Sequence, residues 1–79
     1  MKRPSTLDIK KQFGLAIKRR RLELNISQEE LADRAQLHRT YIGDVERGSR
    51  NLSLENIQKV ASGLGLKVSS LFADYGIED

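Results

Sequence analysis

The chain has 79 residues, of which 38% are hydrophobic, and a formal net charge of +3 at pH 7. This length allows one small domain with a modest aliphatic core, and the lack of cysteine excludes a disulfide framework and a cysteine-based zinc site. No apolar run is long enough to span a membrane, and residues 1–8 lack a signal-peptide core, so we expect a cytoplasmic protein.

The basic residues are unevenly distributed. Eight of the 14 lysines and arginines lie within residues 2–21, three more lie within 39–50, and three carboxylates cluster within 29–33. Two basic regions separated by an acidic one indicate a polyanionic partner. The common alternative for such charge runs is a solvated surface.

Five helices are expected, because Pro4 is the only proline and the β-branched alternation of strands is missing. We expect residues 1–8 to form a flexible polar arm, 9–76 a single domain and 77–79 a tail. Within the arm, Lys2 and Arg3 either add non-specific attraction or are disordered. The first helix is expected over Leu7–Leu24, ended by a left-handed Asn25.

Ser27-Gln-Glu-Glu30 has the pattern of a capping box. In such a box the Ser27 hydroxyl accepts from the amide of Glu30, and the Glu30 carboxylate returns to Ser27. It predicts a second helix over Gln28–Ala35.

A tight turn at Gln36 and Leu37 separates this helix from the third, which we expect over Arg39–Arg47. His38 is its expected cap, and Gly48 is expected to stop it.

The fourth helix is capped by Ser53, and its apolar stripe consists of Leu54, Ile57, Val60, Ala61 and Leu64. A short fifth helix near Val68–Tyr75 carries Leu71 and Phe72. It begins at either Lys67, which is a poor cap, or Ser69.

Residues 28–47 have the spacing of a helix-turn-helix motif. Ala32 supplies the small side chain that two steeply crossing helices need, and Leu37 anchors the turn. Ile42 and Val45 lay the third helix against the second by one narrow stripe. Because the rest of the third helix is polar, its outer face suits the major groove of DNA.

At these residues the chain resembles the phage repressor/Cro (Xre-like) class of bacterial regulators. The segments that carry the resemblance are "SQEELADRA", "RTYIGDVERGSRNLSLENIQKVASGLGL" and "SSLF", within about Phe13–Phe72. "RTYIGDVERGSRN" further resembles the controller proteins of restriction–modification systems. The resemblance implies an all-α, five-helix lambda-repressor-like DNA-binding domain. The chain departs from the family at Gln36, where glycine is usual, and at Arg20, where an apolar residue is usual.

Three residues of the third helix are expected to contact bases. Arg39 can donate two hydrogen bonds to guanine, and Thr40 can meet a thymine methyl group or a phosphate. Asp44 either accepts from cytosine N4 or orients Arg39 or Arg47. Gly43 either lets the backbone approach DNA closely or is incidental.

Seven residues are expected to contact the DNA backbone: Gln28, His38, Tyr41, Arg47, Ser49, Arg50 and Asn51. The resemblance places Gln28 against a phosphate, near the amides of a helix N-terminus. Tyr41 either reaches a phosphate or packs on the second helix, and Arg50 is also a candidate for the minor groove. The resemblance implies that Arg21 and Glu46 form a structural ion pair that fixes the recognition helix.

The apolar residues near the C-terminus exceed what a very small monomer exposes. We expect a two-fold dimer surface made of Leu66, Val68, Leu71, Phe72, Tyr75 and Ile77. Such a dimer sets its recognition helices about 34 Å apart and predicts a pseudo-palindromic operator.

The leading hypothesis is a dimeric, sequence-specific transcription regulator that binds double-stranded DNA in a bacterial or phage nucleoid. By resemblance it controls a restriction–modification system and its own gene, with RNA polymerase as a further partner. The alternative is a protein-interaction module, either an antitoxin or an adaptor to the transcription machinery. An enzyme is not expected, because Asp44 and Glu46 do not face each other and no nucleophile–base pair appears. With one histidine and no cysteine, we expect no metal or cofactor.

Overall fold

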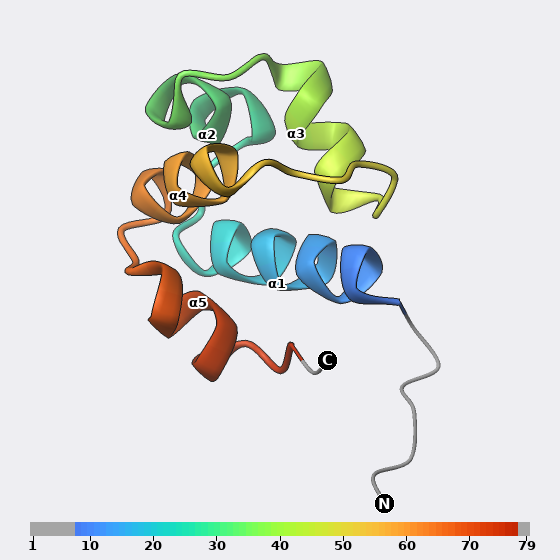
Figure 1. The fold of residues 1–79 in the computed structure, drawn as a ribbon. Helices are drawn as coiled ribbons and strands as arrows, with labels where there is room; N and C mark the ends of the chain where they lie inside the picture. Colours follow the sequence, from blue (N-terminus) through green and yellow to red (C-terminus); the bar gives the residue numbers. More distant parts are fainter. Residues whose placement is uncertain (1–7, 78–79) are drawn as a thin grey trace, which may run out of the picture.

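The computed structural model describes residues 8–77, which form five helices and no strand (Figure 1). The helices are α1 (Ile9–Glu23), α2 (Gln28–Ala35), α3 (Arg39–Glu46), α4 (Leu54–Gly63) and α5 (Val68–Asp74). The expected five-helix, all-α architecture is confirmed. Most of the expected arm, with Lys2 and Arg3, and residues 78–79 of the tail lie outside the described residues.

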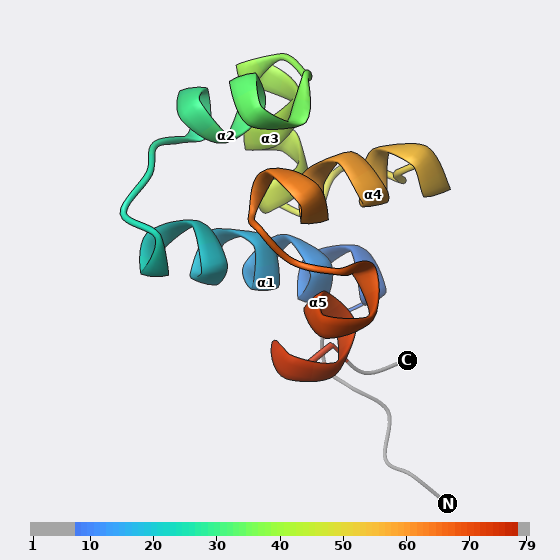
Figure 2. The ribbon, with the colours of Figure 1, turned by 90° about the vertical axis from the view of Figure 1, so that its left-hand side faces the viewer.

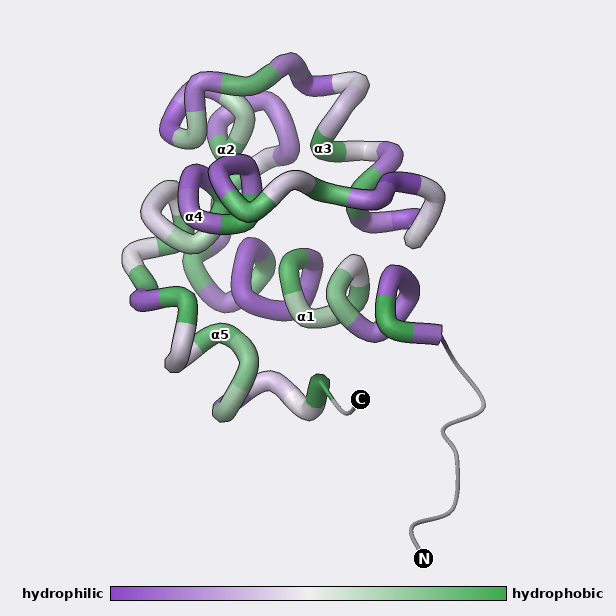
Figure 3. Tube along the Cα trace, in the orientation of Figure 1, coloured by the Kyte–Doolittle hydropathy of each residue, from purple (hydrophilic) through white to green (hydrophobic). Residues whose placement is uncertain are grey.

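Helix α1 runs through the middle of the molecule, with α3 and α4 along one side and α5 along the other (Figures 1 and 2). Helix α2 packs on both α3 and α4. Along the helices, hydrophobic and hydrophilic segments alternate (Figure 3). All five helices contribute to one core, which contains Phe13, Ala16, Ile17, Ile26, Leu31, Ala32, Ile42, Val45, Val60, Ala61, Leu64 and Leu71.

Helix α1 is shorter than expected at both ends. It begins after Asp8, whose carboxylate accepts a hydrogen bond from the amide of Lys11 at 2.9 Å. Asp8 is therefore an N-cap, which the sequence analysis had placed in the flexible arm. The helix ends at Glu23, and Asn25 takes the expected left-handed conformation with φ of 58°.

The capping box at the start of α2 is half formed. The Ser27 hydroxyl accepts from the amide of Glu30 at 3.0 Å, as expected. The Glu30 carboxylate instead accepts from Arg34 at 2.9 Å, one turn along the same helix. An oppositely charged side chain at this spacing competes with the return bond to Ser27.

The turn between α2 and α3 is as tight as expected. Gln36 has φ of 59°, and the amide of Leu37 donates to the carbonyl of Ala32 at 2.9 Å. His38 occupies the N-cap position of α3, but its side chain makes no capping hydrogen bond, which corrects the expected role. At the other end, α3 stops at Glu46, one residue earlier than expected.

Helix α4 is capped by Ser53, whose hydroxyl accepts from the amide of Asn56 at 3.1 Å. The stripe predicted for this helix is wrong at Leu54, which is 79% exposed because it lies at the first turn, outside the core. Lys67 occupies the N-cap position of α5 and makes no side-chain capping bond.

Candidate nucleic-acid interface

Helix α3 is attached to the domain by a narrow apolar edge and a close backbone contact. Ile42 and Val45 are buried in the core. Beside them, α1 contacts the end of α3 at Gly14, where an added Cβ would lie 2.7 Å from the carbonyl oxygen of Glu46. Only a residue without a side chain allows the two helices to come this close.

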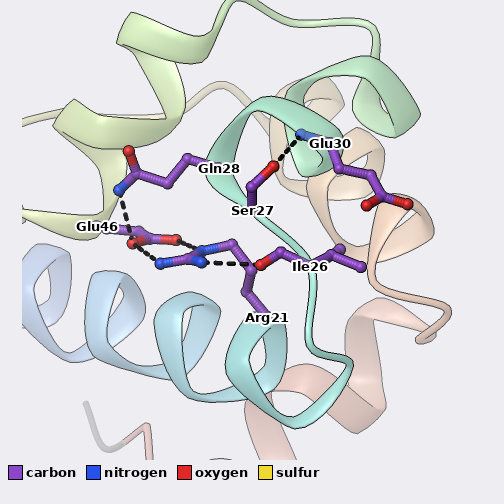
Figure 4. Close-up of polar contacts among 6 residues, drawn as sticks. All are labelled: Arg21, Ile26, Ser27, Gln28, Glu30 and Glu46. Carbon is purple, nitrogen blue, oxygen red and sulfur yellow. Dashed lines mark hydrogen bonds and ion pairs between the residues drawn. The ribbon is translucent and has the colours of Figure 1, made fainter.

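A polar network then fixes the C-terminal end of α3 to α1 and α2 (Figure 4). Arg21 donates to both carboxylate oxygens of Glu46, at 2.7 and 3.1 Å, and to the carbonyl of Ile26 at 2.9 Å. The hydrogen bond to Glu46 raises the pKa of Arg21, against the effect of burial. Gln28 adds a bond from Nε2 to Glu46 at 3.0 Å, so residues of three helices meet at one carboxylate.

The first two residues of α3 lie on its exposed side. Arg39 and Thr40 are both exposed, and neither makes a side-chain hydrogen bond or ion pair within residues 8–77. Their donors are therefore available to a partner molecule. Positions 39, 40, 43, 44 and 47 share one side of the helix at 3.6 residues per turn, opposite buried Ile42 and Val45.

Gly43 occupies the middle of this outward side. A Cβ there would lie 3.4 Å from Arg47 Nη1 and 3.7 Å from Gln28 Oε1. The backbone at Gly43 is therefore covered only by the ends of two flexible side chains. If these side chains move aside, a ligand can approach the helix axis more closely than elsewhere on α3.

Asp44 pairs with two arginines. Its Oδ1 accepts from Arg47 Nη2, and its Oδ2 lies 3.4 Å from Arg50 Nε. Within the described part of the chain it makes no hydrogen bond or ion pair with Arg39, so of the two arginines expected to be oriented by Asp44 only Arg47 is paired with it. Ser49 donates through both its amide and its hydroxyl to the backbone carbonyl of Asp44, each at 3.0 Å, and so folds the loop back over the helix end.

Tyr41, a residue of α3, contacts both the following loop and α4. Its hydroxyl accepts from Asn56 Nδ2 at 3.0 Å, which leaves the hydroxyl hydrogen for another acceptor. The Arg50 guanidinium carbon lies 4.8 Å from the centre of the Tyr41 ring, a cation–π contact. Asn56 was not among the expected site residues, because no pattern distinguishes it from other polar residues in the first turn of α4.

The remaining expected contacts are also accessible. His38 and Asn51 are exposed and make no side-chain hydrogen bond or ion pair in the range 8–77. Gln28 uses one hydrogen of Nε2 for Glu46 and keeps the second for another acceptor.

None of the helices in the described range is long and apolar enough to cross a membrane.

The expected dimer surface needs one correction. Leu71 is 0% exposed within a single chain, so it belongs to the core and cannot contact a second copy. The other members are partly buried against that core: Leu66, Val68, Phe72, Tyr75 and Ile77. The hydropathy of the α5 segment, largely neutral to hydrophobic, is visible in Figure 3.

Arg20, one of the two residues at which the chain departs from the family it resembles, joins α1 to the end of α4 and to the C-terminal segment. Its Nε donates to the carbonyl of Leu64 at 3.1 Å, and its Nη1 lies 3.5 Å from the hydroxyl of Tyr75. Tyr75 in turn donates to Glu23 at 2.7 Å. This last bond is the main reason that the pKa of Glu23 is lowered and that of Tyr75 is raised.

Comparison with known proteins shows that most of the chain is similar to a known protein family. Residues 17–71 match the family model described as "Helix-turn-helix". The control protein C.BamHI of Bacillus amyloliquefaciens is 48% identical over 67 residues, which cover 84% of this chain and 83% of that protein.

Two solved structures are also similar. The restriction–modification controller protein C.AhdI from Aeromonas hydrophila superposes with a TM-score of 0.76 at 44% identity, covering 78% of this chain and 94% of that one. C.Esp1396I bound to a 25 base pair operator site gives a TM-score of 0.78 at 35% identity, covering 84% of this chain and 87% of that one.

Proposed function

The chain belongs to the helix-turn-helix family and, within it, to the control proteins of restriction–modification systems, and we propose on that basis that it is a sequence-specific regulator of transcription that binds double-stranded DNA. Chains of this family are not enzymes.

The observation that carries the proposal is the arrangement of α3. Its inner side is fixed by core residues and by the bond between Arg21 and Glu46, while Arg39 and Thr40 stand exposed on the opposite side without partners among the described residues. A rigid helix with a free arginine at its start is suited to reading base edges in the major groove.

We assign direct base contacts to Arg39 and Thr40, with Asp44 beside them. Contacts to the DNA backbone are assigned to Gln28, His38, Tyr41, Arg47, Ser49, Arg50 and Asn51. These residues surround the start and the end of α3, so a duplex against α3 meets donors on both sides of the base-reading positions. Phosphate contacts of this kind set affinity and register, whereas base contacts set specificity.

The active form in this proposal is a homodimer on a pseudo-palindromic operator. The partly buried apolar residues Leu66, Val68, Phe72, Tyr75 and Ile77 supply the surface for a second copy. C.Esp1396I was solved on an operator of 25 base pairs, which is long enough for two half-sites one helical turn apart. We propose that the regulated genes include a restriction–modification system and the regulator's own gene, and that the protein also contacts RNA polymerase in the bacterial cytoplasm.

The test is selection of bound sites from a random DNA pool by the full chain, followed by salt titration on the selected site. We expect an inverted repeat with half-sites about one helical turn apart and an affinity that falls steeply with salt. Recovery of no common sequence, together with equal affinity for every duplex tested, would remove the regulator function.

A further inference from the structure

Asp44 is the carboxylate on the outward side of α3, and it is shared by two arginines that we assign to the DNA backbone. We propose that Asp44 suppresses binding to non-cognate DNA by holding Arg47 and Arg50, and that it is thereby a determinant of specificity. This inference rests on the proposed DNA-binding function and names a residue that controls it.

The geometry gives each arginine its own carboxylate oxygen. Arg47 follows the last turn of α3 and pairs with Oδ1, whereas Arg50 lies in the loop and pairs with Oδ2. The loop is held in this position by the two bonds from Ser49 to the Asp44 carbonyl. One acidic side chain therefore offsets half of the charge of the two cations next to the base-reading residues.

Exposure shows which partner is free to leave. The Asp44 side chain is 23% exposed, whereas those of Arg47 and Arg50 are 67% and 48% exposed. The arginines have long flexible side chains, and the carboxylate is fixed to the helix. DNA phosphates can therefore reach both guanidinium groups, but taking both leaves Asp44 in place and without an ion-pair partner.

Arg39 provides the contrast. It makes no hydrogen bond or ion pair within the range that the structure describes, so it meets DNA without losing a partner. Arg50, by comparison, makes two interactions, an ion pair with Asp44 and a cation–π contact with the ring of Tyr41. The interface thus contains Arg39, which has no partner among the described residues, and Arg47 and Arg50, which must give up Asp44 before they bind a phosphate.

When Arg47 and Arg50 exchange Asp44 for DNA phosphates, the cost in free energy is higher on non-cognate DNA than on the operator. Any duplex that draws Arg47 and Arg50 onto phosphates leaves the Asp44 carboxylate facing the same polyanion, which is unfavourable for like charges. A cognate site recovers this cost when a cytosine N4 amino group donates to Asp44. Random DNA has no such donor in register, so the penalty remains.

The test compares Asp44→Asn with Asp33→Asn, a control that removes one negative charge from an exposed position of α2 that is outside the arginine cluster. Both are made in the full chain, and thermal unfolding verifies that they fold. Binding is measured on the selected operator and on a random duplex of equal length, over a range of salt concentrations.

We expect Asp44→Asn to bind random DNA at least about threefold more tightly than Asp33→Asn does, since two ion pairs that restrain cations are gone. Its salt dependence on random DNA should steepen by about 0.9 in log–log slope for each arginine released. The ratio of operator to random affinity should fall.

Equal behaviour of the two variants on random DNA would overturn the inference, and so would loss of binding to both duplexes by Asp44→Asn. The regulator function fails separately, through the absence of any operator preference in the unaltered chain. Because the comparison on random DNA does not need an operator, it tests in either case whether Asp44 restrains Arg47 and Arg50.

Discussion

The guanidinium of Arg21 and the carboxylate of Glu46 form a two-bonded ion pair that joins α1 to the last residue of α3. Both side chains are largely buried, at 11% and 4% exposed. Removing one partner therefore leaves the other charge buried, and the recognition helix loses its ion pair to α1.

Replacing this arginine is expected to destabilise the domain strongly. Arg21→Met should lower the free energy of unfolding by about 3–5 kcal/mol, the usual cost of an uncompensated buried charge. Urea unfolding measures it. The control is Arg19→Met, which breaks the exposed pair with Glu23 and should cost no more than about 1 kcal/mol. Equal effects of the two substitutions would contradict a structural role for Arg21.

Gly14 allows α1 and α3 to touch, so a methyl group there should force them apart. We expect Gly14→Ala to lower the free energy of unfolding by about 1–3 kcal/mol through overpacking, even though alanine favours helices. Thermal unfolding with calorimetry measures the loss. An unchanged or raised midpoint would show that the backbone of α3 yields easily at this point.

Gly43 should respond in the opposite way. Its nearest neighbours are the flexible ends of Arg47 and Gln28, so Gly43→Ala is expected to stabilise the fold by up to about 1 kcal/mol through helix propensity. If those side chains move aside and DNA approaches the backbone there, the same variant binds the operator more weakly. A stabilised protein with unaltered affinity would make this glycine incidental to binding.

Arg39 and Arg47 should differ in how they affect binding. Arg39→Ala is expected to weaken operator binding by about 1–3 kcal/mol and to relax the preference at one base pair. Arg47→Ala should weaken operator binding without relaxing the preference at any single base pair, and should reduce the salt slope on the operator by about one unit. Competition titrations with singly substituted operators measure both effects. Uniform losses for Arg39→Ala across all sequences would exclude it from base reading.

The bond from Tyr75 to Glu23 predicts a pH dependence of stability. Because the pKa of Glu23 is lowered from its ordinary 4.5 in the folded chain, its contribution is present at neutral pH and is lost as pH falls through the folded pKa. Tyr75→Phe removes the largest cause of this shift. The difference in stability between wild type and variant should shrink from neutral pH to about pH 3, as measured by urea unfolding. A constant difference in stability across that range would contradict the conclusion that the bond from Tyr75 lowers the pKa of Glu23.

Much of the fold follows from local sequence signals. The bounds of α2, the left-handed Asn25, the tight turn at Gln36 and the cap at Ser53 depend on neighbouring residues, and each is found where expected. Leu54 and Leu71 were misplaced because burial depends on tertiary packing, which helical periodicity alone does not determine.

In the candidate site too, some features follow from the local sequence and others depend on tertiary packing. Residue type and spacing were enough to select Arg39 and Thr40 as the exposed residues at the start of α3. The pair of Asp44 with Arg47 is one of the alternatives expected from the sequence, at a spacing of three residues. The contact of Asp44 with Arg50 depends on how the loop folds back after Gly48, and the partnership of Tyr41 with Asn56 depends on the position of α4. Neither of these last two contacts has a signature in the linear sequence.

The groups that hold α3 and the groups that face away from it are different residues. Ile42, Val45 and Glu46 fix the helix from within, whereas positions 39, 40 and 44 carry no share of the core. The outer positions are thus free to vary without unfolding the domain. Under the proposed function, substitutions at these few positions change the DNA sequence that is read while the scaffold stays intact.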